Sequence, residues 1–220
     1  MTLRKRIFDL FFASLLVVIL APVMIGLLIL ILVKQGRPLF YVAERMKTPD
    51  QPFNLWKLRT MTVVQGDQGV SGGDKASRVT PVGGWLRRKR LDEFPQLWNI
   101  LKGDLSFVGP RPPLREYVER FPEIYGKVLQ SRPGVTGLAT IVFHTHEHNL
   151  LKRCTSPEET DDIYSRICVP RKARLDLIYQ QNQSTCYDFD LVFCTIGNLF
   201  RREAKSKPPK TPVFSAKNRP

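Results

Sequence analysis

The feature that most constrains this chain is an uncharged, almost wholly apolar run from Leu10 to Val33, 24 residues long. A straight helix of that length reaches about 36 Å, which exceeds the roughly 30 Å thickness of a bilayer's hydrocarbon core. A cleaved signal peptide fits poorly, because the run is too long and no small-residue cleavage site follows it. The run therefore predicts a membrane anchor.

Two details bear on how this anchor meets the bilayer. Positive charge flanks it on both sides, at residues 4–6 and at Lys34 and Arg37, so the positive-inside tendency favours both ends on the cytoplasmic face. Pro22 falls at the middle, where its missing N–H predicts a kink. Both details fit a re-entrant helix that enters and leaves on one face, although these residues alone leave a spanning helix equally open.

The amino-acid composition limits the kinds of partner that this chain can bind. The chain has 220 residues, a formal net charge of +14 and 43% hydrophobic residues, which excludes wholesale disorder. Its four cysteines form no CxxC pattern and indicate reduced thiols that face the cytosol. Basic residues gather at both ends of the chain, which favours attraction to a membrane surface. No nucleic-acid-binding motif is present, so we expect no nucleic-acid partner.

The rest of the chain predicts an α+β fold of short elements. Residues 39–46 and 53–61 have the pattern of two strands, joined by a turn at 48–52. We expect an extended segment over 135–143, a mobile loop over 65–75 and irregular segments over 104–113 and 144–170. Helices are expected over residues 82–90, 92–101, 113–130, 171–181 and 188–200.

The strongest chemical signal is Asp92-Glu93-Phe94-Pro95, which begins one residue after a run of four basic residues. Proline is tolerated in a first helical turn, so Pro95 predicts that Asp92 lies at or near a helix N-terminus. An ordinary aspartate N-cap is one interpretation. In the other, cations keep the Asp92 carboxylate ionised beside a bound phosphate, where it can act as a nucleophile, and Glu93 could hold Mg²⁺.

Three further basic residues are candidates for phosphate binding. Lys57 and Arg59 alternate along a predicted strand, so both project from one face. Arg111 lies between two prolines that restrict the backbone, and its planar guanidinium suits bidentate phosphate contact. An ordinary solvated surface remains the alternative for all three.

Three segments together resemble a known family. Residues 91–112 (LDEFPQLWNILKGDLSFVGPRP), 53–61 (FNLWKLRTM) and 132–137 (RPGVTG) closely resemble the signature of bacterial sugar transferases, the monotopic phosphoglycosyl transferases. The resemblance covers about residues 4–138 and, more loosely, 171–200. It implies an N-terminal re-entrant membrane helix (residues 1–36) and a small cytosolic catalytic domain of short helices and a β-hairpin (37–200). The Pro- and Lys-rich composition of residues 201–220 predicts a basic disordered tail.

The resemblance also implies an activity. Such enzymes transfer a sugar-1-phosphate from a UDP-sugar to undecaprenyl phosphate and release UMP, at the cytoplasmic face of the bacterial inner membrane, as a first step of glycan assembly. Asp92 would carry a covalent phosphosugar, Glu93 would complete the catalytic pair, and both would hold Mg²⁺. A homodimer is possible. The positions that match basic residues near the family's active site are Lys57, Arg59, Arg87 and Arg111.

One departure from the family pattern falls after residue 137. The family continues WAQVNGR, whereas this chain reads LATIVFH, so His144 stands at the position of a phosphate-contacting arginine. His144 is kept as a substrate-binding candidate, and a catalytically impaired member that binds nucleotide-sugar or lipid phosphate stays open as the alternative function. His144, His146 and His148 would share one face of a strand and could bind zinc, although surface or substrate contact is preferred.

Overall fold

A computed structural model describes residues 2–63 and 73–201 of the chain. Its first half forms α1 (Leu3–Gln35), β1 (Phe40–Thr48), β2 (Gln51–Leu58), η1 (Gly73–Arg78), α2 (Pro81–Lys89), η2 (Leu91–Glu93), α3 (Gln96–Lys102) and β3 (Ser106–Val108). Its second half forms α4 (Arg115–Arg120), α5 (Pro122–Val128), β4 (Gly134–Thr136), α6 (Leu138–Leu151), α7 (Pro157–Ile163), η3 (Tyr164–Cys168), α8 (Val169–Gln181) and α9 (Thr185–Arg201). The predicted α+β class, with a long apolar helix before many short elements, is confirmed. The predicted loop over 65–75 and basic tail over 201–220 lie almost entirely outside the described residues.

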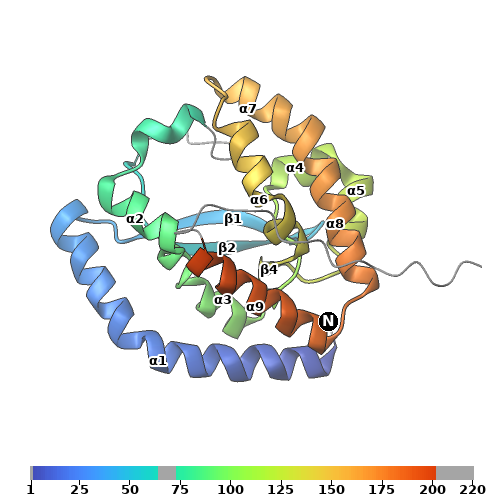
Figure 1. Ribbon diagram of the computed structural model, residues 1–220, viewed down its shortest axis with the longest axis horizontal. Helices are drawn as coiled ribbons and strands as arrows, with labels where there is room; N and C mark the ends of the chain where they lie inside the picture. The colour runs from blue at the N-terminus through green and yellow to red at the C-terminus, as the bar shows by residue number, and fades with distance from the viewer. Residues whose placement is uncertain (1, 64–72, 202–220) are drawn as a thin grey trace, which may run out of the picture.

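Helix α1 is bent, and both of its ends contact the rest of the molecule. Figure 1 shows it as two segments joined by a sharp bend, and Pro22 is its internal proline. Near its start, Arg6 donates to the carbonyls of Ile100 and Leu101 at 2.6 and 2.7 Å. Near its end, Leu27 and Ile31 pack in one cluster with residues of β2 and α2. A straight helix of 33 residues would extend about 50 Å and could not make both sets of contacts.

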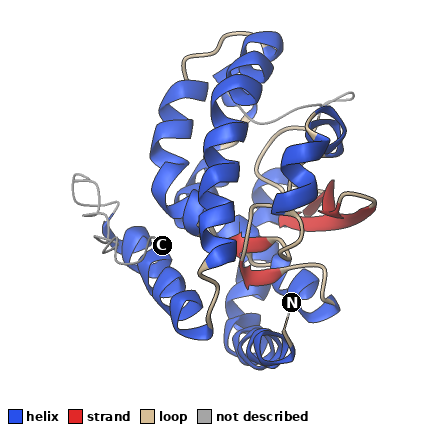
Figure 2. Ribbon diagram, turned by 90° about the vertical axis from the view of Figure 1, so that its right-hand side faces the viewer, coloured by secondary structure: helices blue, strands red, loops and turns tan. Residues whose placement is uncertain are grey.

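Two small sheets carry the loops of the site. Strands β1 and β2 form an antiparallel hairpin in which Tyr41 pairs with Lys57. Strands β3 and β4 pair in parallel, with Ser106 opposite Gly134, and Figure 2 shows the β1–β2 hairpin projecting at the edge of the molecule. The β3–β4 approach requires a glycine, because a Cβ at Gly134 would collide with the backbone of Val108 and Gly109. This pairing brings the loop after β3 beside the loop after β4.

The main hydrophobic core lies among α4, α5, α6, η3 and α8. Tyr117, Val128, Phe143 and Val169 are buried in it, each from a different helix. Figure 1 shows α8 running alongside this group on the opposite side of the molecule from α2. The core therefore fixes α6 and α8 relative to the loop that follows β3.

The expectation of an extended segment over 135–143 is wrong beyond Thr136. Helix α6 begins at Leu138 and continues to Leu151. Thr140, Ile141 and Val142 are β-branched and favour strands, but helical geometry lets Phe143 and Leu151 enter the main core together. Tertiary packing overrides local propensity here.

Two further expectations need correction. The single helix expected over 113–130 is two helices, α4 and α5, because Pro122 has no N–H to continue the first and begins the second. The segment expected to be irregular over 144–170 is mostly helical, comprising the end of α6, then α7 and η3. Tyr164 and Cys168 of η3 are buried in the main core, which explains the order of this stretch.

Candidate active site

Asp92 lies in a tight turn between two helices. Helix α2 ends at Lys89 and is capped by Arg90, which adopts a left-handed backbone conformation with φ 55° and ψ 22°, and η2 follows at once. Pro95 then caps α3. The predicted position near a helix N-terminus is therefore correct to within one turn, and the left-handed Arg90 sets the direction in which the two acidic side chains leave the backbone.

The Asp92 carboxylate is buried and makes no hydrogen bond to the described residues. The residue is 7% exposed, and among the described residues none donates it a hydrogen bond. Burial raises the pKa of Asp92 above its ordinary value, and Lys57, Arg87 and Arg111 oppose that shift. Such a group is ready to accept a cation or to attack an electrophile, since no protein contact has to be broken first.

Glu93 points into a cluster of cations. Its carboxylate oxygens lie 2.7 Å from the Arg90 guanidinium, 3.2 Å from that of Arg111 and 3.6 Å from the Lys57 ammonium. Burial acts to raise the pKa of Glu93, but these cations outweigh it and hold the pKa well below its usual range. The carboxylate is thus ionised at any ordinary pH and fixes three side chains of opposite charge around itself.

Lys57 and Arg111 come from separate elements and meet at Glu93. Lys57 lies near the end of β2, where burial lowers the pKa of its ammonium to about 8. Arg111 follows β3 in the Pro110-Arg111-Pro112 segment, and its side chain is 37% exposed. Arg87 projects from the last turn of α2, where its Nε donates to Thr60 Oγ1 at 2.9 Å. The structure therefore gathers Lys57, Arg87 and Arg111 around Asp92 and Glu93.

Arg59 has a different position from the one expected. It lies just beyond β2, and its guanidinium donates to the backbone carbonyls of Gln35, Gly36 and Arg37 at the end of α1. Cations are favourable at a helix C-terminus, where carbonyls lack intrahelical partners. The structure thus does not bring Arg59 to the acidic pair.

His144 lies on α6 rather than on a strand. Its ring stacks on that of His148, one turn later, with centroids 6.5 Å apart, whereas His146 contacts Arg171 at 3.1 Å. The three histidines do not share a face, and within residues 2–63 and 73–201 no group of three or more His, Cys, Asp or Glu side chains could hold a metal. The zinc interpretation is wrong because it assumed the alternation of a strand.

Sequence reasoning missed two cations at the site. Arg90 is the last residue of the basic run, and its spacing of three residues from Glu93 is typical of a paired contact. Arg45 lies opposite Phe53 on the hairpin face that also carries Lys57. Burial and then the charge of Arg111 lower the pKa of Arg45, so the two guanidinium groups lie close enough to repel each other.

The same turn, dyad and Pro-Arg-Pro loop carry the resemblance noted in the sequence. A family model described as bacterial sugar transferase matches residues 1–202, that is, every element described above. The chain belongs to the bacterial sugar transferase family. This match extends the similarity across residues 139–170, a stretch in which no motif of the family is found.

Several bacterial proteins are similar to this chain. The UDP-glucose:undecaprenyl-phosphate glucose-1-phosphate transferase of Klebsiella pneumoniae is 30% identical over 89% of this chain and 40% of its own length. The exopolysaccharide production protein ExoY of Sinorhizobium fredii is 31% identical over 88% of this chain and 84% of its own. An uncharacterized sugar transferase, EpsL of Bacillus subtilis, is 38% identical over 62% and 67%, respectively. The chain spans only about two fifths of the length of the Klebsiella pneumoniae relative.

Proposed function

We propose that this chain transfers a sugar-1-phosphate from a UDP-sugar to undecaprenyl phosphate and releases UMP. The observation that carries the proposal is the buried Asp92 carboxylate, to which no described residue donates a hydrogen bond, beside a Glu93 that holds three cations. The names of several relatives describe transfer of a glucose or N-acetylgalactosamine phosphate from the UDP-sugar to undecaprenyl phosphate. The sugar that this chain uses is left to experiment.

The reaction proceeds in two displacements at one phosphorus. An Asp92 oxygen attacks the β-phosphorus of the UDP-sugar; a bond from phosphorus to the carboxylate forms, and the bond to the bridging oxygen breaks. The bridging oxygen keeps its electron pair and leaves with UMP. A phosphate oxygen of undecaprenyl phosphate then attacks the same phosphorus, the bond to Asp92 breaks, and the lipid diphosphate sugar leaves.

The surrounding cations make these displacements possible. A diphosphate and a lipid phosphate must approach an anionic carboxylate, so positive charge has to offset the repulsion. Lys57, Arg87 and Arg111 supply that charge from β2, α2 and the loop after β3. Because Glu93 already holds Lys57 and Arg111 in place, they need no reorganisation when the phosphates arrive.

A magnesium ion fits Asp92 better than it fits Glu93. Mg²⁺ is commonly bound by one or two carboxylates together with substrate phosphates. The Asp92 oxygens take no hydrogen bond from the described residues, whereas both Glu93 oxygens contact cations within 3.6 Å. When bound, the ion would neutralise phosphate charge. Asp92 would hold it, and Glu93 would join only by giving up one of its cationic partners.

The bent α1 fits a membrane helix that enters and leaves on one face. Its two ends contact the same globular part, and large apolar side chains along it are exposed, among them Phe11, Val18, Ile25 and Val33. We infer that α1 lies in the cytoplasmic leaflet of the bacterial inner membrane. The catalytic turn then lies near the interface, where a water-insoluble acceptor can reach Asp92 without leaving the bilayer.

The test is UMP release from a panel of UDP-sugars, with undecaprenyl phosphate, Mg²⁺ and detergent-solubilised protein. Asp92→Asn is expected to lose at least about 10³-fold in turnover, because the amide cannot attack phosphorus. Its thermal unfolding temperature should match or exceed that of the wild type, since burial disfavours the ionised carboxylate. Substantial turnover by Asp92→Asn would remove Asp92 from the role, and EDTA should silence the wild type.

A catalytically impaired member is the second candidate, and His144 is the observation that favours it. Glu147 lies one turn after His144 on α6, and its charge raises the pKa of Arg111. This part of α6 therefore faces the site. A histidine carries less dependable positive charge at neutral pH than an arginine. Under this alternative, UDP-sugar binds without UMP release, and His144→Arg restores turnover.

A further inference from the structure

A cavity of about 410 Å³ opens where the end of α1 meets the start of α2, away from the acidic pair. None of the four residues Lys57, Asp92, Glu93 and Arg111 lines it. The residues that do line it come from α1, from the segment after β2 and from the first turn of α2: Lys34, Gln35, Arg59, Met61, Thr62, Thr80, Pro81 and Val82.

Two polar groups at this cavity are buried and lack partners. Arg59 is 9% exposed, and its Nε has no hydrogen-bond partner among the described residues, although its terminal nitrogens cap α1. The Gln35 side-chain nitrogen is likewise buried without a partner, while its oxygen accepts from Thr80. Both unpartnered groups are N–H donors, and buried donors normally find an acceptor.

The charges around these donors are positive. Lys34 adds an ammonium to the lining, and α2 begins at the cavity, so the positive end of its helix dipole faces the same space. Of the described residues that line the cavity, none is acidic. An anion with several acceptor oxygens complements this lining.

The cavity continues into an apolar one. Leu30 and Trp85 line a neighbouring space of about 290 Å³ that shares Pro81 and Val82 with the first. Trp85 is 39% exposed although it is a large aromatic residue. The two spaces together present a donor-rich end and an apolar end, side by side, along the last turns of α1.

We propose that this junction binds one anionic phospholipid, with its phosphate at Lys34, Gln35 and Arg59 and an acyl chain along Leu30, Val82 and Trp85. The inference rests on the membrane placement of α1 proposed above, because the end of a re-entrant helix emerges at the level of the headgroups. The acceptor of the reaction is a poorer occupant, since its phosphate has to reach Asp92, at the other end of α2 from this cavity.

Helix α2 connects the proposed lipid site to the active site. The backbone of Thr60, next to Arg59, accepts from Thr80 at the start of α2, and the Thr60 hydroxyl accepts from Arg87 in the last turn. A phosphate at Arg59 would therefore hold the end of α1 and both ends of α2 in one arrangement. Bound lipid is expected to position α2 and not to take part in phosphoryl transfer.

Tryptophan quenching tests the proposal on the full chain in detergent micelles. Phosphatidylglycerol with brominated acyl chains is titrated in, and brominated phosphatidylcholine is titrated in parallel. We expect saturable quenching with phosphatidylglycerol at about one lipid per protein, lost in Trp85→Phe. Lys34→Gln should weaken the apparent affinity about fivefold, the effect of one lysine at a lipid surface.

Arg37→Gln is the matched control, because Arg37 is exposed at the same end of α1 but does not line the cavity. It should change the affinity less than twofold. Equal losses in both variants, or equal quenching by phosphatidylcholine, would overturn the site. Displacement of the brominated lipid by undecaprenyl phosphate at a tenfold lower mole fraction would assign the cavity to the acceptor instead. Asp92→Asn should bind lipid like the wild type, which separates this result from any failure of the proposed reaction.

Discussion

At the scale of single residues, the site depends on a division of labour between two adjacent carboxylates. No described residue donates a hydrogen bond to Asp92, whereas Glu93 pairs with three cations. A neutral residue at 93 would leave Lys57 and Arg111 facing each other without an anion between them. Glu93 therefore acts on the reaction through the cations that it positions.

Glu93→Gln should shift the pH dependence of the reaction. The Glu93 charge raises the pKa of Lys57, which burial lowers to about 8, so removing that charge lowers the Lys57 pKa further. Lys57 assists phosphate binding only when protonated. Activity thus falls as pH rises through this pKa, and the fall should begin at lower pH in Glu93→Gln.

The measurement is the pH profile of kcat/KM for UMP release, which reports groups of the free enzyme. Glu119→Gln, an exposed charge change on α4, is the control and should leave the profile unchanged. A basic limb at the same pH in wild type and Glu93→Gln would contradict the coupling of Glu93 to Lys57.

At the scale of elements, the bend of α1 decides which contacts its two ends can make. Pro22→Ala restores a hydrogen-bond donor and removes the clash with the preceding turn, so the helix should straighten. A straight α1 spans the bilayer and carries its first turn to the far side. Contacts of Arg6 with α3 would then be lost.

Labelling of a cysteine placed at Leu3 with a membrane-impermeant maleimide measures this change, in a background with Cys186 and Cys194 replaced by serine. We expect labelling only after lysis with Pro22 present, and labelling of intact spheroplasts with Pro22→Ala. Val23→Ala keeps the proline and is the control. Identical labelling of the two proline states would show that the bend is set by contacts with the domain instead.

Helix α8 carries a buried acid that should make stability depend on pH. Burial raises the pKa of Asp176 to about 7, and one of its oxygens has no hydrogen-bond partner among the described residues. A carboxyl with a raised folded pKa stabilises the fold fully below its unfolded pKa near 4, and this contribution is lost as pH rises through 7.

The difference in melting temperature between Asp176→Asn and the wild type should therefore favour the variant more at pH 8 than at pH 5. Melting temperatures of both proteins at these two pH values measure the effect. Asp190→Asn, an exposed change on α9, should show no such difference. A parallel pH dependence of wild type and Asp176→Asn would mean that Asp176 ionises freely in the folded protein.

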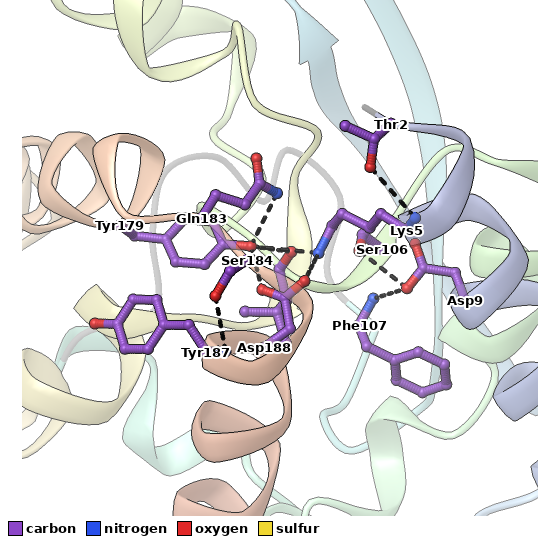
Figure 3. A network of polar contacts seen from close by, with 11 residues as sticks. Thr2, Lys5, Asp9, Ser106, Phe107, Tyr179, Gln183, Ser184, Tyr187 and Asp188 are labelled. Atoms are coloured by element: carbon purple, nitrogen blue, oxygen red, sulfur yellow. Dashed lines mark hydrogen bonds and ion pairs between the residues drawn. The ribbon is translucent and has the colours of Figure 1, made fainter.

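At the scale of the whole molecule, one buried network joins the start of the chain to its last helices. Lys5 of α1 lies 2.5 Å from Asp188 of α9 and donates to the Tyr179 hydroxyl of α8 at 3.3 Å (Figure 3). The Tyr179 hydroxyl in turn donates to Asp188 at 2.6 Å. Side-chain exposure of Lys5 and Asp188 is 7% and 3%, so each charge depends on the other.

Lys5→Met should destabilise the protein by about 3–5 kcal/mol, because it leaves the Asp188 charge buried without its partner. The double variant Lys5→Met with Asp188→Leu should recover much of that loss, since two apolar residues can replace a buried pair. Thermal unfolding in detergent measures both, and Lys102→Met on the exposed side of α3 is the control. Additive losses in the double variant would rule out the coupling.

The sequence alone determined whatever depends on near neighbours along the chain. It predicted the apolar helix with a kink at Pro22, the β1–β2 hairpin and the helices α2, α3, α8 and α9, because hydrophobic period, turn residues and prolines act over a few positions. It also singled out Asp92, Glu93 and Arg111, whose roles in catalysis stay predictions. The family resemblance implies that the three residues lie together.

Only the tertiary structure decided how distant segments meet. It paired β3 with β4, turned residues 138–151 into a helix, broke 113–130 at Phe121 and gave Arg59 to the end of α1 rather than to the acidic pair. Each outcome depends on contacts between residues far apart in the chain, whose burial outweighs the small preferences of local sequence. The cations around Glu93 belong to this class as well, since β2, η2 and the loop after β3 converge only once the core has formed.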